Sequence, residues 1–365
     1  LVAYGAQDVY LTGNPEVTFF QAKYKRHTNF AMENIEQTVN GTAANSGRVS
    51  VTVARNGDLV GDMYIELESD VDTSALACWV AERAVNNVEL SIGGQRIDKH
   101  YQKWWRLYSE LYLDESKKAT YGKMTTAING KTVYLPLFFF FNRNPGLYLP
   151  LIALQYHEVR VDIDLASDFS TYCNTSVFKV WANYIYLDTE ERRRFAQKGH
   201  EYLIEQVQHT GTDTVDTGAT KQVRLSYNHP VKELVWCFSN TAATSSLWNF
   251  TTDTNNIAIA SNVTAISESN CFVPTSLSGA PLLSVGAAGS TVDFTEEAVG
   301  PLKKFKLILN GQDRFKEQEG KYFNQVQSFN HHNGSPYAGV YSYSFALKPE
   351  EHQPTGTCNF SRIDN

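Results

Sequence analysis

The sequence predicts an all-β protein made of two tandem eight-stranded sandwiches, most simply two jelly rolls, and three observations lead to this fold class. Segments that alternate apolar and polar residues outnumber helical patterns along the whole chain. Three short motifs occur twice, in the same order. Aromatic residues make up 13% of the chain and charged residues only 19%, a composition that favours strands and packed sheet surfaces.

Strand patterns account for most of the first half. The segment "RVSVTVARNGDLVGDMYIELES" contains two alternating stretches joined at Asn56-Gly57, a dipeptide suited to the positive φ angles of a tight turn. The segment "HEVRVDIDL" alternates without a break from Glu158 to Leu165, and "VFKVWANYIYL" and "LKKFKLILNG" are further predicted strands. Helical patterns are few, and the best candidates are the region around "HYQKWWRLYSELYL" and the segment "TEERRRFAQKG".

The duplication rests on matching motifs. "NIEQTVNGT" (34–42) matches "LIEQVQHTGT" (203–212), and "VELSIGGQR" (88–96) matches "FKLILNGQD" (305–313), with a strand–turn–strand unit between them in each half. We therefore expect the domains in this order: an N-terminal arm at 1–29, a first jelly roll at 30–190 and a second jelly roll at 191–365.

The two copies differ in length at two places. The second copy carries a Ser/Thr/Ala/Asn/Gly-rich stretch near 239–295, which we expect to be a long loop insertion on the outer end of the domain. The first copy continues from Gly94 to about Leu187, whereas the second stops at Asn365, soon after Gly311. We expect the second jelly roll to lack its C-terminal strands, and a longer chain to be more soluble than one with an open edge.

Composition excludes several classes of protein. A net charge of −7 argues against a nucleic-acid coat, which needs a basic face. The five cysteines are far apart with no C-x-x-C pair, so buried free thiols are expected in place of a disulfide framework or a zinc site. No apolar run is long enough for a transmembrane helix, and no cofactor motif is found.

Four segments carry a resemblance to a known family. "LTGNPEVTFFQAKYKRHTNF", "NHPVKELVW", "ERRRFAQKGHEYLIEQVQ" and "YSFALKPEEHQPTGTCNFSRIDN" resemble the double jelly-roll major capsid proteins of nucleocytoplasmic large DNA viruses, with the algal-virus and mimivirus-like branch nearest. The resemblance implies a non-enzymatic structural subunit of an icosahedral capsid, made in the host cytoplasm and located in the virion. It also implies homotrimers of pseudo-hexagonal outline that tile a lattice over an internal membrane, together with minor capsid proteins.

The opening segment from Leu11 to Phe30 combines a turn, an aromatic pair and a basic run. In the resembled family this segment is an internal arm, which implies contact with neighbours or with the membrane side. A compatible alternative is that Phe19, Phe20 and Tyr24 plug the bottom of the first sandwich. Direct nucleic-acid binding by its basic residues is disfavoured, because so few cations make a weak footprint.

Enzymatic chemistry has two candidate sites. Asp162 and Asp164 are two residues apart on a strand, near the carboxylate separation of inverting glycosidases, but Glu158 and Arg160 continue the same polar face and suggest a solvated or intersubunit surface. The pair His331-His332 suggests metal binding, but adjacent strand residues point apart and no third ligand is suitably spaced. A jelly-roll glycosidase therefore ranks third among the candidate functions.

Carbohydrate binding is the second candidate function. A tandem β-sandwich lectin would stack sugars on the aromatic cluster Tyr101, Trp104, Trp105 and Tyr108, although the cluster is better explained as closing one end of the first sandwich or lining a subunit contact. Six N-x-[ST] sequons occur, at Asn40, Asn174, Asn249, Asn262, Asn333 and Asn359. Asn249 and Asn262 lie in the predicted insertion and are expected to be exposed; glycosylation of them is not expected.

Overall fold

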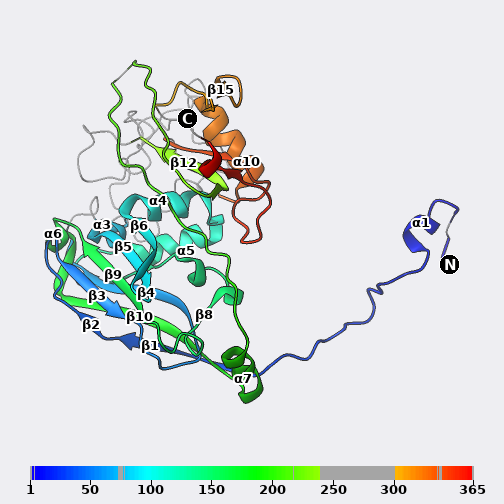
Figure 1. Cartoon of the computed structure of the whole chain (residues 1–365), viewed down its shortest axis with the longest axis horizontal. Helices are drawn as coiled ribbons and strands as arrows, with labels where there is room; N and C mark the ends of the chain where they lie inside the picture. Colours follow the sequence, from blue (N-terminus) through cyan, green and yellow to red (C-terminus); the bar gives the residue numbers. More distant parts are fainter. Residues whose placement is uncertain are drawn as a thin grey trace, which may run out of the picture.

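The computed structural model describes residues 2–3, 5–72, 77, 79–216, 218–238, 301–334, 336 and 339–363. The chain forms a large sandwich followed by a smaller domain above it, and an extended arm leaves the sandwich at the N-terminal end (Figure 1). The predicted insertion at 239–295 lies outside the described residues.

The elements of the first domain follow one another along the chain. They are β1 (Phe30–Gln37), β2 (Val39–Asn40), β3 (Arg48–Thr52), β4 (Leu59–Ser69), α3 (Val80–Ala84), β5 (Val85–Ile92), β6 (Gln95–Tyr101), α4 (Gln102–Leu111), α5 (Glu115–Thr125), β7 (Thr132–Pro136), η1 (Phe140–Asn142), η2 (Pro145–Leu147), β8 (Leu149–Pro150), β9 (Val159–Leu165), α6 (Phe169–Tyr172) and β10 (Cys173–Leu187). The arm before them contains α1 (Val9–Thr12), and α7 (Thr189–Gln197) follows β10. Helices α4 and α7 confirm the two predicted helices.

The second domain has shorter elements. They are β11 (Pro230–Val231), β12 (Glu233–Cys237), β13 (Lys304–Phe305), β14 (Ile308–Leu309), β15 (Gln312–Asp313), β16 (Gln318–Glu319), η4 (Tyr322–Val326), α10 (Gln327–His331), β17 (Val340–Ser344), β18 (Cys358–Asn359) and η5 (Phe360–Arg362).

The first domain is a jelly roll. One sheet has the strand order β1-β10-β4-β7, with β8 also pairing with β4, and the other has the order β2-β3-β9-β5-β6. The first and last long strands, β1 and β10, lie side by side and are antiparallel from Phe30↔Leu187 to Gln37↔Val180. Every neighbouring pair in both sheets is antiparallel, as in a Greek-key sandwich.

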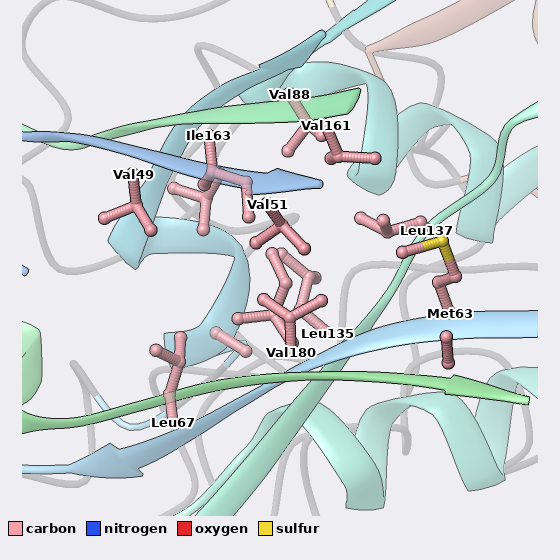
Figure 2. Close-up of a cluster of buried hydrophobic side chains, with 14 of the residues drawn as sticks. Val49, Val51, Met63, Leu67, Val88, Leu135, Leu137, Val161, Ile163 and Val180 are labelled. Carbon is pink, nitrogen blue, oxygen red and sulfur yellow. The ribbon is translucent and has the colours of Figure 1, made fainter. Parts of the chain in front are cut away.

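The core lies between the two sheets. Val51 of β3 and Val161 of β9 project from one sheet toward Leu67, Leu135 and Val180 of the other, and all five are fully buried (Figure 2). The predicted alternation in β9 is confirmed, because its odd-numbered residues are buried in this core. Each such side chain contributes roughly 1.5–3 kcal/mol when it leaves water.

The prediction of a hairpin at Asn56-Gly57 is wrong. Strand β3 pairs with β2 and β9, whereas β4 pairs with β10, β7 and β8, so the chain crosses between sheets here. Neither residue has a positive φ. Glycine is needed at 57 for space, since a Cβ there would lie 2.9 Å from the Cβ of Tyr184. The hydroxyl of this buried tyrosine donates to the carbonyl of Ala54 (2.5 Å).

In the second domain the described strands form four two-stranded sheets, β11-β18, β12-β17, β13-β16 and β14-β15. One duplicated motif has the same geometry in both halves: Gly93 and Gly94 turn with φ of 59° and 81°, and Asn310 and Gly311 with φ of 51° and 75°. Two consecutive positive φ angles favour a tight hairpin turn. The other motif differs, because Ile35-Gln37 lies in β1 whereas the described residues 203–212 form no strand.

Replacement of Gly57 by alanine should destabilise the first jelly roll by about 1–3 kcal/mol, because the new methyl group would overlap Tyr184 at the crossing between sheets. Gly199→Ala is the matched control, since a Cβ at 199 meets nothing within 4 Å. The unfolding midpoints of both variants are measured in denaturant by tryptophan fluorescence. Equal midpoints for the two variants would contradict the steric explanation.

Candidate functional site

Helix α4 joins the two domains. Trp105 is fully buried in the core of the first jelly roll, and its Nε1 donates to the carbonyl of Pro136 (2.8 Å). Leu107 and Leu111 pack instead with Val340 of β17, in the second domain. The helix therefore closes one end of the first sandwich and provides the surface on which the second domain packs.

The aromatic cluster predicted from the sequence belongs to this junction. Trp104 and Tyr108 are half-buried, and the Tyr108 ring stacks on Phe138 with centroids 4.2 Å apart. The Tyr101 ring lies 4.9 Å from that of His209. These rings are packed against protein, so the sugar-stacking interpretation of the cluster is wrong.

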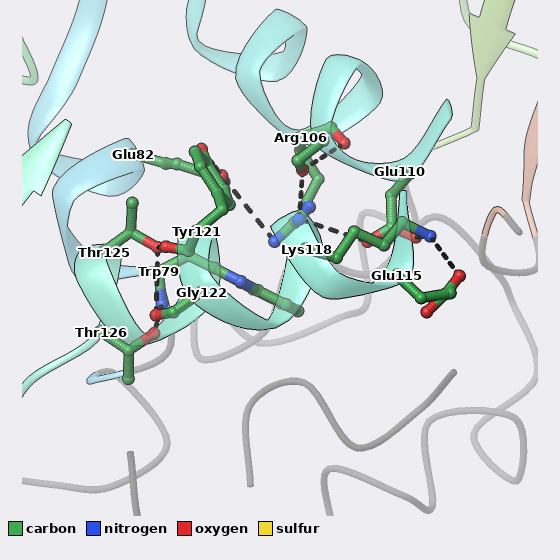
Figure 3. Close-up of polar contacts among 11 residues, drawn as sticks. Trp79, Glu82, Arg106, Glu110, Glu115, Lys118, Tyr121, Gly122, Thr125 and Thr126 are labelled. Atoms are coloured by element: carbon green, nitrogen blue, oxygen red, sulfur yellow. Dashed lines mark hydrogen bonds and ion pairs between the residues drawn. The ribbon is translucent and has the colours of Figure 1, made fainter. Parts of the chain in front are cut away.

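The opposite side of α4 carries a buried charge network (Figure 3). The guanidinium of Arg106 lies 3.8 Å from the ring centroid of Trp79 and pairs with Glu110 (3.2 Å) and Glu82 (3.8 Å). Lys118 of α5 pairs with Glu110 as well (3.6 Å). Burial raises the pKa of Glu82, although the charge of Arg106 opposes the rise. The network ties α3, α4 and α5 together below the second domain.

Sequence reasoning missed this network, although a signal was present. Glu82 and Arg83 interrupt the otherwise apolar run from Ala75 to Val85. A charged pair inside such a run indicates charges that are buried with partners.

A second polar contact spans the domains at Glu233, whose carboxylate binds Tyr112 of the first domain and His332 of its own domain. Nε2 of His332 contacts Glu233 of β12 and its Nδ1 lies 3.0 Å from Glu350, while the hydroxyl of Tyr112, just after α4, donates to Glu233 (2.6 Å). Burial alone would lower the pKa of His332, but hydrogen bonds to the two carboxylates outweigh it and raise the pKa to about 9. The imidazolium is thus a structural cation at neutral pH.

The two adjacent histidines have separate partners. Nδ1 of His331 lies 2.9 Å from the carbonyl oxygen of Leu347, away from the carboxylates that hold His332. Within the described part of the chain, no group of three or more His, Cys, Asp or Glu side chains could hold a metal ion.

Glu205 makes a third contact across the junction. Its carboxylate accepts from Arg143 of the first jelly roll (3.0 Å) and from Lys232 of the second domain (2.5 Å). The Arg143 guanidinium also lies 5.1 Å from the ring centroid of Tyr108. The Glu205 carboxylate therefore pairs with one cation from each domain.

The carboxylates considered for glycoside hydrolysis are held by cations. Asp162 accepts from Ser50 (2.6 Å) and Arg160 (2.8 Å) and pairs with Arg48 (3.2 Å), which also approaches Asp164 (3.7 Å). Burial raises the pKa of Asp162, but these hydrogen bonds outweigh it and lower the pKa below its ordinary value. A general acid needs a raised pKa, so the arrangement fits a structural ion cluster on the face of the sheet.

The described aromatic residues of the N-terminal arm are exposed to solvent. Phe19, Phe20 and Tyr24 are 92%, 99% and 93% exposed, and the arm runs away from the sandwich (Figure 1). The prediction that these residues plug the bottom of the chain's own first sandwich is therefore wrong. The described residues contain no helix of the length and apolarity needed to cross a membrane.

The sequons differ in their surroundings. The predicted exposed sites, Asn249 and Asn262, lie outside the described residues. Nδ2 of Asn174 donates to Glu68 (3.0 Å) and that of Asn333 to Glu350 (2.6 Å), so both amides are engaged. The thiols of Cys173, Cys237 and Cys358 are unpaired, and burial raises the pKa of Cys173 to about 12.

Two family models cover nearly the whole chain. The family described as "Major capsid protein N-terminus" matches residues 18–188, and "Large eukaryotic DNA virus major capsid protein" matches residues 191–365. The major capsid protein of Paramecium bursaria Chlorella virus 1 is 45% identical over 394 residues, covering 100% of this chain and 84% of the relative.

This chain belongs to the large eukaryotic DNA virus major capsid protein family. It is a structural capsid subunit with the double jelly-roll fold. The quasi-atomic capsid structure of the PBCV-1 virus matches with a TM-score of 0.78 and 42% identity, over 95% of this chain and 85% of that one. The Faustovirus major capsid protein shares the fold alone, with a TM-score of 0.63 and 11% identity over 98% of this chain and 89% of that chain.

The His332 contact makes the stability of this capsid subunit depend on pH. The folded-state pKa of about 9 exceeds the unfolded value of 6.5, so the stabilisation is complete below pH 6.5 and is lost as pH rises through 9. The size of the effect is roughly 3 kcal/mol at most. His332→Gln should remove most of this pH dependence in thermal melts between pH 6 and 10.

His331→Gln is the matched control, the same substitution at the neighbouring position, and should keep the pH dependence of the parent protein. A parent protein whose melting temperature is flat across this pH range would show that the imidazolium contributes nothing.

Proposed function

We propose that the chain forms homotrimeric capsomers of pseudo-hexagonal outline, which tile the shell of an icosahedral particle. Membership of the capsid family supports this, and the junction around α4 supports it physically. Two jelly rolls fixed to each other by α4, Glu205 and Glu233 make one rigid block, and three such blocks give six similar corners.

The exposed arm is the observation that carries the assembly proposal. Large aromatic side chains that are almost fully exposed mark a surface that a partner covers. In the assembled shell the arm contacts neighbouring copies, minor capsid proteins or the internal membrane side. The overall charge of −7 supports the absence of direct nucleic-acid binding.

The protein works by shape and burial, without a cofactor and without catalysis. The acidic residues considered for catalysis are paired with cations, which suits ion clusters that fix surfaces. The predicted division into 1–29, 30–190 and 191–365, with an outward-facing insertion near 239–295, remains part of the proposal. Synthesis in the host cytoplasm before incorporation into the virion belongs to it as well.

Purified full-length protein should have three times the mass of the chain in size-exclusion chromatography with light scattering at micromolar concentration. Trimers of this kind close through head-to-tail contacts, which bury large surfaces and survive dilution. A folded protein that stays monomeric would contradict the proposal, whereas a lectin or glycosidase has no such requirement.

A further inference from the structure

The outer face of the first sheet is acidic and aromatic. Residues of β4 that point away from the core alternate with the buried ones. Together with neighbours on β1, β10 and β7, this face carries the acidic residues Glu36, Asp62, Glu66 and Glu68 and the aromatic residues Tyr64, Tyr134 and Trp181. Among the residues of these four strands, Lys179 supplies the positive charge on this face, and its Nζ lies 4.0 Å from the Glu66 carboxylate.

A cavity of about 440 Å³ lies at one end of this face, between β4, β7 and α5. Met63, Met124, Leu137 and Phe138 are among its apolar lining residues, and Asp62 and Lys117 are among its polar ones. An apolar pocket with a few polar groups is the form of site that takes an aromatic side chain.

The arm has the complementary chemistry. From Thr18 to Asn29 it carries three cations, Lys23, Lys25 and Arg26, and no acidic residue. Phe19, Phe20 and Tyr24 are interleaved with them and are exposed. These twelve residues extended span up to about 40 Å, enough to cross a sheet and reach a neighbour.

We propose that the arm of one copy binds the outer face of the first sheet of a second copy. An arm phenylalanine fills the cavity between β4, β7 and α5. The arm cations pair with the acidic residues of β4 on this face, Asp62, Glu66 and Glu68. This inference rests on the proposed homotrimer and names the surface that the arm covers within it.

A second copy is the occupant because the chain's own arm runs away from the sandwich (Figure 1). The charges match: the arm segment is a cation-only aromatic strip, and the face is an acid-rich aromatic surface of the same protein. Exchange of an identical segment between copies needs no other partner, and each trimer would close three such contacts.

Cysteine cross-linking of the full chain tests the docking. Copies that carry Phe20→Cys and one affinity tag are co-expressed with copies that carry Lys117→Cys and another tag, and mild oxidation should link the two. Arg96→Cys, on β6 of the other sheet, is the control position and should not link. Single-cysteine variants measure the background from the native thiols.

Charge reversal tests the recognition. Lys23→Glu with Lys25→Glu should lower the cross-linked fraction by about fivefold or more, and Glu66→Lys with Glu68→Lys should restore it. Arg193→Glu with Arg194→Glu, the same charge change at exposed positions of α7, should leave the fraction unchanged. Thermal melts establish that each variant is folded.

Each alternative result is informative. Cross-links within single copies, or equal yields at Lys117→Cys and Arg96→Cys, would overturn the docking. Trimers without the cross-link would overturn it while the proposed capsomer stands, and would direct the arm to a minor protein or a membrane. Monomers would overturn both.

Discussion

The junction of the two domains depends on how Arg106 is buried. A guanidinium taken out of water costs several kcal/mol unless charge and hydrogen bonds replace the lost hydration. Here the ring of Trp79 covers one face and the carboxylates of Glu82 and Glu110 balance the charge. With this side of α4 fixed in the first domain, Leu107 and Leu111 are presented to the second.

The remaining contacts at the junction set orientation more than they add stability. The apolar surface around Val340 supplies the non-directional part of the packing, whereas Glu205 and Glu233 each need a particular geometry. Both polar contacts use carboxylates shared between cations or donors from the two domains. A subunit that must fit the same neighbours many times in a shell gains from such directional contacts, because they exclude slightly rotated arrangements.

Sequence patterns predicted the local elements of the first jelly roll and not its long-range pairings. The alternation in β9 and the helix at α4 follow from periodicity, which depends on residues a few positions apart. The prediction of a hairpin at Asn56-Gly57 was wrong because a connection between two sheets shows the same strand–turn–strand pattern in the sequence as a hairpin does. The partners of His332 are 99 residues before it and 18 after it, and no local signal joins them. The aromatic cluster was located correctly, but its partners are scattered along the chain: Tyr108 stacks on Phe138, and Trp104 packs beside Val340 of β17.

The paired ionisable groups and the exposed aromatic rings of the arm differ in what they leave available to other molecules. Ionisable groups that could serve catalysis are neutralised by partners: Asp162 by arginines, Glu82 by Arg106 and His332 by carboxylates. The arm is the opposite case, with aromatic rings that no described part of the chain covers. Exposed rings of this size lower solubility, and large exposed apolar surfaces mark sites that partners cover. In the proposed assembly, the surface that is a liability in the isolated subunit is therefore the one that contributes to association.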